Sequence, residues 1–377
     1  MNKKILIIIG VVIILAVIGV WMYIFLTGKT SPTEDSFAQF SEGGDRQTHD
    51  TDLFDFNNTN NTLPTTPQRL RQLTLRPVAG AGFLNEGISY VEQGTGHVFY
   101  INLSTGNESL VSGTTLTQTR DAVFSKNGTY VAITNYDGNK RTVVGSVSQE
   151  GKLDGVSLPT DASGVSFGED ENLLYYFTNS TDGTRGYEYD IESAVSVELF
   201  YVPLRDVRVI WGDEIYIYTT PSSEQTGFIY KIINNNLQYV TDGGFGLMAF
   251  GTKNGPVVTK SNGANLFSKP VEEDSSVLFG VLMPEKCSSV ASATICAIPE
   301  EINENTFPDT WYKGTESYTD TLWDIDINNG SSGFLLNLLN ESGRKIDVIK
   351  IGTNEGGDKT YFINKNDNTL WLFDSSL

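Results

Sequence analysis

The sequence predicts an all-β protein built from antiparallel meanders that are repeated along the chain. Residues 87–113 contain three runs of β-branched and aromatic residues, separated by glycine turns at Gly94–Gly96 and at Gly106. Glycine supplies the positive φ angles that tight hairpin turns require. The pattern returns at intervals of roughly forty residues, the period of one four-stranded blade in a β-propeller. We therefore expect a propeller of seven four-stranded blades, with six or eight as alternatives because the fifth and sixth segments are weakly patterned.

Each expected blade corresponds to a segment of the chain. Asn127–Gly128, Asp137–Gly138 and Asp182–Gly183 are expected hairpin turns within the second and third blades. A loop insertion at about 299–319 interrupts the sixth blade. The segments are 77–113, 121–153, 164–191, 207–240, 247–271, 285–326 and 347–377.

The last blade has only three predicted strands, which end near Leu377. An unclosed ring would leave strand edges exposed, so propellers are closed when one end of the chain supplies the missing strand of the other. The strand-like stretch Leu70–Thr74 precedes the first blade and has no blade of its own. We expect it to complete the seventh blade.

The N-terminal part of the chain predicts a membrane anchor. Residues 5–26 carry no charge and are long enough to cross a bilayer as a helix, and Lys3 and Lys4 before them keep residues 1–4 cytoplasmic. A cleaved signal peptide is the alternative. Residues 27–68 are polar and rich in Asn, Thr and Pro, which indicates a disordered linker before the propeller domain at 69–377. The expected location is therefore a single-pass membrane protein with its propeller outside the cytoplasm.

Composition excludes several classes of function. The formal net charge of −20 makes nucleic acid an improbable partner, because such a surface repels phosphate. The chain has two histidines, His49 and His97, which disfavours His-based zinc sites and Ser–His catalysis. Asp324–Gly330 resembles the start of a calcium loop but lacks the glycine and the glutamate that such a loop needs, so a strand and a turn explain it better. No metal or cofactor is predicted.

No catalytic motif is present in the sequence. The nucleophile elbow, the phosphate-binding loop and the HExxH motif are all missing. A pair of carboxylates acting on a glycan remains an alternative, because any two of the 46 acidic residues could meet in space. A self-associating structural component of the cell envelope is a second alternative. We expect no enzymatic activity.

The two cysteines, Cys287 and Cys296, are expected on adjacent antiparallel strands of the sixth blade. Neighbouring strands can bring the Cβ atoms to about 4 Å, the separation that a disulfide requires. A disulfide at the base of the insertion is therefore predicted. Free thiols are the alternative, and a two-thiol metal site would lack further ligands.

The insertion is the best candidate binding site, because loops on a rigid scaffold often carry binding residues and exposed Trp and Tyr are favoured interface anchors. The alternative is a loop folded back as a plug, with its aromatic residues buried. The candidate residues are Phe307, Asp309, Trp311, Tyr312, Lys313 and Tyr318.

The repeats resemble bacterial propellers of the TolB/WD40-like kind over about residues 69–377. Residues 284–287, 295–297, 308–314 and 322–326 look similar to uncharacterised propellers with an N-terminal membrane anchor. The Trp–Asp pair of true WD40 repeats occurs once, at Trp323–Asp324. The resemblance implies binding in or over the central channel. The expected function is a membrane-anchored, extracytoplasmic scaffold that binds a protein or polymer of the envelope, in an oligomeric state that the sequence does not fix.

Overall fold

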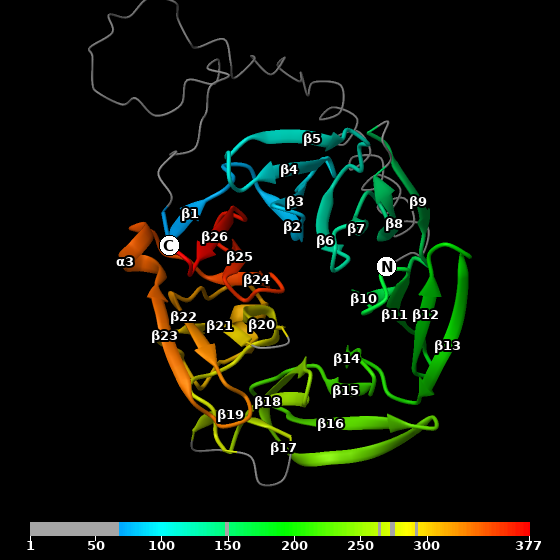
Figure 1. Cartoon of the computed structure of the whole chain (residues 1–377). Helices are drawn as coiled ribbons and strands as arrows, with labels where there is room; N and C mark the ends of the chain where they lie inside the picture. Colours follow the sequence, from blue (N-terminus) through cyan, green and yellow to red (C-terminus); the bar gives the residue numbers. More distant parts are fainter. Residues whose placement is uncertain (1–67, 148–150, 263–264, 272–275, 291–292) are drawn as a thin grey trace, which may run out of the picture. The chain divides into compact units, whose positions relative to one another are not determined.

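The structure, a computed structural model, describes residues 68–377 except 148–150, 263–264, 272–275 and 291–292. The described residues form six antiparallel sheets that follow one another around a ring (Figure 1). Five sheets have four strands and one has six. The only helices in this part of the chain are the short α2 (Asp309–Tyr312) and α3 (Leu338–Ser342) and the 3-10 turn η1 (Pro284–Lys286). The architecture is an all-β propeller with six blades.

In the first three blades, the order of the strands in each sheet is their order in the chain. Gly128 and Gly138 have φ angles of +71° and +77° at the ends of two hairpins of the second blade, where turns were predicted. The strands are β2 (Val78–Leu84), β3 (Gly87–Glu92), β4 (Val98–Asn102), β5 (Glu108–Ser112), β6 (Thr119–Phe124), β7 (Tyr130–Asn135), β8 (Arg141–Val147), β9 (Leu153–Ser157), β10 (Ser163–Phe167), β11 (Leu173–Asn179), β12 (Thr184–Asp190) and β13 (Val195–Val202).

Neighbouring blades pack face to face because side chains alternate along each strand. In β11, Leu174 and Tyr176 point to one face and join Ala132 of the preceding blade in a buried cluster. Tyr175 points to the other face and stacks on Trp211, which follows the first strand of the next blade, with 5.4 Å between ring centroids. Each blade is thus buried between its two neighbours.

The fourth sheet contradicts the prediction of seven separate four-stranded blades. Its strands are β14 (Val207–Ile210), β15 (Tyr216–Thr219), β16 (Thr226–Ile233), β17 (Asn236–Thr252), β18 (Gly255–Ser261) and β19 (Leu266–Pro270). The single strand β17 pairs first with β16 and then with β18, so the segments expected as the fourth and fifth blades form one sheet.

Glycines explain why β17 continues where a break between blades was expected. Phe245 faces both Thr226 of β16 and Ser261 of β18 in the two strand pairs. A Cβ atom on the adjacent Gly244 would lie 2.8 Å from the Ser261 carbonyl oxygen, so only glycine allows this close approach. Gly246, at φ +63°, then lets the strand change direction without ending.

The fifth sheet consists of β20 (Cys287–Val290), β21 (Ala293–Pro299), β22 (Asp320–Ile325) and β23 (Ser332–Asn337). Residues 300–319 form the connection between β21 and β22 and contain α2. The Asp324–Gly330 stretch is the end of β22 and a turn, in which the Asp326 carboxylate accepts hydrogen bonds from the Asn328 and Asn329 amides.

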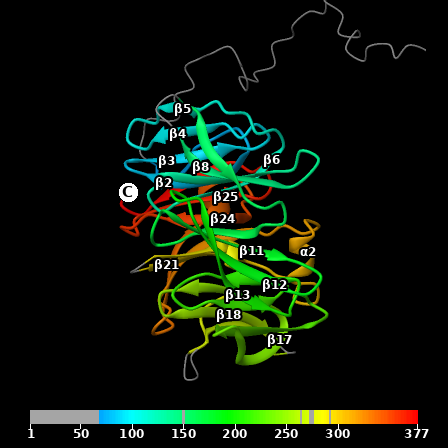
Figure 2. The ribbon, with the colours of Figure 1, turned by 90° about the vertical axis from the view of Figure 1, so that its right-hand side faces the viewer.

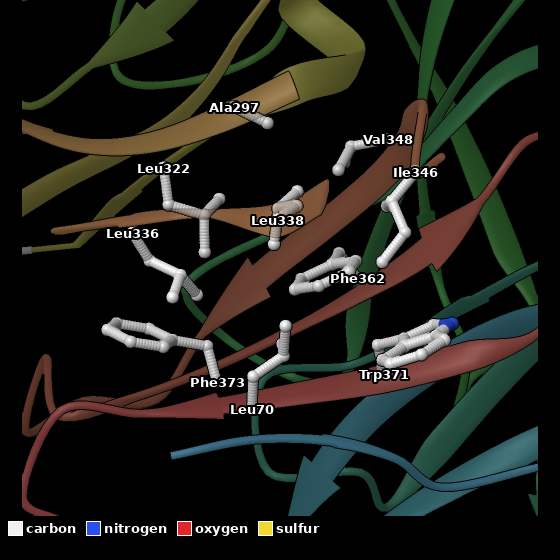
Figure 3. Close-up of a cluster of buried hydrophobic side chains, with 10 residues drawn as sticks. All are labelled: Leu70, Ala297, Leu322, Leu336, Leu338, Ile346, Val348, Phe362, Trp371 and Phe373. Carbon is white, nitrogen blue, oxygen red and sulfur yellow. The ribbon is translucent and has the colours of Figure 1, made fainter. Parts of the chain in front are cut away.

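The sixth sheet closes the ring and confirms the predicted role of the N-terminal strand. Strand β1 (Leu70–Gln72) pairs with β26 (Leu370–Asp374), followed by β25 (Lys359–Asn364) and β24 (Val348–Thr353). In Figure 1 the blue β1 lies beside the red β26. Leu70 packs beside Trp371 and Phe373 in a buried cluster that also includes residues of the fifth sheet (Figure 3).

The predicted membrane helix at residues 5–26 and the linker at 27–68 lie outside the described residues, apart from residue 68. Within the described part of the chain, no helix is long and apolar enough to cross a membrane. The described structure therefore gives no support to the predictions of a transmembrane helix in the fold and of a single-pass membrane location, and both are withdrawn.

If the β1–β26 seam holds the ring together, truncating its buried anchor will weaken the whole fold. Leu70 is 8% exposed, whereas Leu75, just beyond β1, is 68% exposed. We expect Leu70→Ala to lower the free energy of unfolding by about 2–5 kcal/mol through loss of buried area and a residual cavity. The matched control Leu75→Ala should change it by less than about 0.5 kcal/mol. Urea unfolding followed by tryptophan fluorescence measures both, and equal effects would contradict the role of the seam.

Candidate functional site

The insertion, residues 300–319, lies over one face of the propeller. Figure 2 views the ring from the side and shows α2 at this face, away from the C-terminus. Its ends are fixed by the strands from which it arises, because β21 ends at Pro299 and β22 begins at Asp320. The Glu300 amide donates to the Thr319 carbonyl oxygen at 2.9 Å and so joins the two ends.

Three of the predicted binding residues are buried. Phe307, Trp311 and Tyr318 are 1%, 2% and 4% exposed and form one apolar cluster with Met248 of β17 and Met283. They occupy the interior positions that the plug alternative describes. Burial of such rings stabilises the docked insertion.

The other three predicted binding residues lie at the margin of this cluster. The Asp309 carboxylate accepts a hydrogen bond from the Ser223 amide at 2.8 Å and so ties α2 to the loop between β15 and β16. Lys313 is exposed, with its Nζ 3.6 Å from the Asp309 carboxylate. Tyr312 is half-buried. The binding role of the six residues stays a prediction.

Tyr312 belongs to a polar network that joins the insertion to the inner part of the fourth sheet. Its hydroxyl donates to Glu285 Oε2 at 3.1 Å, and the Arg208 guanidinium lies 4.5 Å from the centre of its ring. Arg208 Nη1 donates to Glu285 Oε1 at 2.8 Å. Burial raises the pKa of Tyr312 well above its ordinary value, with Glu285 adding to the effect, and burial raises the pKa of Tyr218 to about 12. Both phenols are therefore neutral at physiological pH, where they act as hydrogen-bonding groups.

A second network of buried charges lies beneath Trp311. Lys286 of η1 contacts the carboxylates of Asp320 and Asp347, and all three side chains are fully buried. Trp311 Nε1 donates to both oxygens of Asp347 at 3.0 Å, and the Tyr318 amide donates to its Oδ2 at 3.1 Å. The insertion is thus fixed to the interior by hydrogen bonds that end on one carboxylate.

The surface of the insertion forms a half-open depression of about 420 Å³, lined by residues 300–303, residues 316–319 and Lys345. Its lining contains three carboxylates, those of Glu300, Glu301 and Glu316, and one ammonium group, that of Lys345. Lys345 Nζ donates to the Ser317 carbonyl oxygen at 2.9 Å. Among the described residues none of the three carboxylates forms an ion pair, so the depression carries net negative charge.

The predicted disulfide is confirmed. Cys287 of β20 and Cys296 of β21 stand directly opposite each other, with 4.2 Å between their Cα atoms, and their sulfurs are bonded. Cys287 directly follows Lys286, so the covalent cross-link and the buried charges lie at the same base of the insertion.

Sequence reasoning missed the residues that hold the insertion, namely Arg208, Glu285, Lys286 and Asp347. One signal was available for Asp347, which stands in an apolar run between Ile346 and Val348. A single carboxylate in such a run indicates a buried partner of opposite charge. Nothing in the sequence around Lys286 indicated that Lys286 is the positively charged partner of Asp347.

The fold is similar to those of several solved propellers. The β-propeller domain of the Trilobed protease from Pyrococcus furiosus is 12% identical, covers 80% of this chain and 96% of its own, and gives a TM-score of 0.53. The WD40 repeats of RRP9 are 9% identical over 81% of this chain and 97% of theirs, with a TM-score of 0.53. Pyrococcus horikoshii acylaminoacyl peptidase is 12% identical over 79% of this chain, which spans only 51% of that enzyme, with a TM-score of 0.52.

These similarities establish the fold alone, and they support the expected likeness to WD40/TolB-like propellers. No family model matches the sequence, and no curated protein matches it. Because the similar structures include peptidases as well as WD40 proteins, the shared fold does not distinguish an enzyme from a binding module. The Trilobed protease domain has an open velcro topology, whereas β1 and β26 close the ring here.

Removal of the Asp347 carboxylate tests the anchoring of the insertion. In Asp347→Ala, the indole N–H of Trp311 and the amide of Tyr318 lose their acceptor inside the protein. We expect a loss of about 2–5 kcal/mol in the free energy of unfolding, because unsatisfied buried donors are costly. Glu304→Ala, an exposed carboxylate of the same insertion, is the control and should have an effect below about 0.5 kcal/mol. Chemical denaturation measures both, and a loss as small as the control's would show that the network does not anchor the insertion.

Proposed function

We propose that this chain is a non-catalytic binding module that holds a protein partner against the insertion at 300–319. The observation that carries the proposal is the depression of about 420 Å³ on the insertion, with three carboxylates that have no cationic partner among the described residues. The propeller fold, typical of binding and scaffold modules, supports it.

The charge of the depression indicates the kind of segment that it would bind. Glu300, Glu301 and Glu316 present negative charge, and the Lys345 ammonium is engaged by a backbone carbonyl. Two of the carboxylates are already held in place, since Glu300 accepts from Asn337 Nδ2 at 2.5 Å and Glu316 accepts from Thr310 Oγ1. A lysine- or arginine-rich segment complements such a site.

The anchoring beneath the depression favours binding. Tyr318 lines the depression and also belongs to the buried cluster of the insertion. Because the loop is already ordered, a partner would not have to supply the free energy of ordering it. Acidic charge on a preorganised surface also accelerates encounter with a basic partner at low salt.

A charge-reversal series tests the proposal with an oligolysine peptide as the probe. Glu301 is exposed and forms no ion pair among the described residues, so Glu301→Lys removes an attractive charge without disturbing the fold. We expect it to weaken the binding of a fluorescent octalysine to the full chain by about 3- to 10-fold at low salt. Fluorescence anisotropy measures the affinity.

Glu224→Lys provides the matched control. Glu224 is also exposed and lies outside the insertion, so its reversal changes the net charge of the chain by the same amount. A change of less than about twofold is expected for it at the same ionic strength. Equal losses in the two variants would mean that the peptide senses only overall charge, and would contradict a site at the insertion.

A further inference from the structure

The buried charges at the base of the insertion have an unusual composition. Lys286, Asp320 and Asp347 are each 0% exposed, and lysine and aspartate are almost never fully buried unless they are paired, as they are here. The Nζ atom of Lys286 lies 5.3 Å from the ring centre of Trp311 and 5.9 Å from that of Tyr318. Aromatic rings therefore take the place of solvent around a primary amine that touches two carboxyl groups.

The two carboxyl groups have different surroundings. Asp347 accepts hydrogen bonds from Trp311 and from Tyr318, and the Lys365 Nζ lies 3.8 Å from its Oδ2. Both oxygens of Asp347 are therefore hydrogen-bonded. Asp347 Oδ1 lies 2.5 Å from Lys286 Nζ and can take a proton from it.

Asp320 has the opposite character. Its Oδ2 accepts a hydrogen bond from the Val348 amide at 2.7 Å and contacts Lys286 Nζ. Its Oδ1 is buried and has no hydrogen-bond partner among the described residues. Burial raises the pKa of Asp320, although the Lys286 ammonium opposes the shift. Asp320 therefore takes up a proton more readily than an exposed carboxylate does.

We propose that Lys286 and Asp320 form an intramolecular amide bond that cross-links the base of the insertion. The geometry supplies each part of the condensation: an amine in contact with the carboxyl group, a second carboxylate in contact with the amine, and exclusion of bulk water. Holding two reactants in contact within a rigid interior accounts for much of the rate of such a reaction. This inference is independent of the proposed binding function.

The condensation balances without a co-reactant. Lys286 Nζ passes one proton to Oδ2 of Asp320, which it contacts, and this gives a neutral amine and a carboxylic acid. Nζ then attacks Cγ, and negative charge develops on Oδ1 of Asp320. Asp347 Oδ1, which contacts Nζ, takes a second proton from the nitrogen and gives it to Oδ2 as the Cγ–Oδ2 bond breaks. Oδ2, to which the Val348 amide donates, leaves as water, Oδ1 becomes the amide oxygen, and Asp347 is again a carboxylate.

The mass of the full chain after reduction of the disulfide tests the proposal. We expect it to be lower than the sequence mass by one water, about 18 Da. Trypsin should no longer cleave after Lys286, and tandem mass spectrometry should find a branched peptide that joins the segments containing Lys286 and Asp320. A reduced chain with its full sequence mass and normal cleavage after Lys286 would overturn the proposal.

Two controls keep the result specific. Cyclisation at Asp137–Gly138 or Asp182–Gly183 would also remove a water, but would leave cleavage after Lys286 intact. Lys286→Arg retains the positive charge but cannot form the amide in this geometry, so the loss of mass assigned to Lys286 should disappear. A loss of water that persists in Lys286→Arg would assign the loss to another site and overturn the proposal.

The variant Asp347→Asn tests the role of Asp347, once circular dichroism has shown that the variant is folded. Uncross-linked chain should accumulate in it, and complete cross-linking would exclude Asp347 as the proton carrier.

Discussion

Closure of the ring is the constraint on which the rest of the propeller depends. Each sheet of a propeller has two faces, and each face is buried against a neighbouring sheet. All faces are buried in this way only when the last sheet of the ring packs against the first. Here β1 precedes the first blade in the chain but pairs with β26 of the last blade, so the two ends of the described chain share one sheet. The Val78 amide donates to the Asn368 carbonyl oxygen at 2.8 Å, which continues the seam into the first blade. On β24, Lys350 Nζ donates to the Ala79 carbonyl oxygen at 2.7 Å and contacts Asp121, so three blades also meet at the inner strands.

The insertion adds a second level of organisation to this ring, and it depends on buried charge rather than on strand pairing. Burying an ammonium group and two carboxylates is costly unless each finds its partners. Lys286, Asp320 and Asp347 come from η1, the start of β22 and the residue before β24, so their mutual contacts fix the insertion to two sheets. Trp311 joins this network through its indole nitrogen while its ring fills the apolar cluster. Trp311 therefore holds the insertion in place both by a hydrogen bond and by apolar packing.

Local patterns in the sequence were sufficient to predict most of the fold. Alternating strand residues, Asn–Gly or Asp–Gly turns and the facing cysteines depend on neighbours in the chain. The closing strand at Leu70 pairs with Phe373 near the other end of the chain, and it was predictable because a propeller ring must close. The blade count failed at β17, because a glycine-rich stretch such as Asp242–Gly246 is typical of a loop and continues as a strand only when two flanking strands pair with it. The expectation that the aromatic residues of the insertion are exposed failed for a related reason. Exposed and buried aromatic residues look alike in sequence, and the carboxylate that holds Trp311 inside is Asp347, far along the chain.

Charge is distributed differently in the interior and at the surface of the insertion. In the interior, the Lys286 ammonium contacts two carboxylates, and Asp347 also lies close to the Lys365 ammonium, so attraction is satisfied within the molecule. At the surface, the carboxylates of the depression have no ion-pair partner among the described residues, and they belong to the excess that gives the chain its net charge of −20. Interior charge pairing therefore fixes the shape of the loop, and the proposed binding depends on the unpaired surface charge. Because Tyr318 takes part in both regions, a change in the buried network would also alter the acidic surface above it.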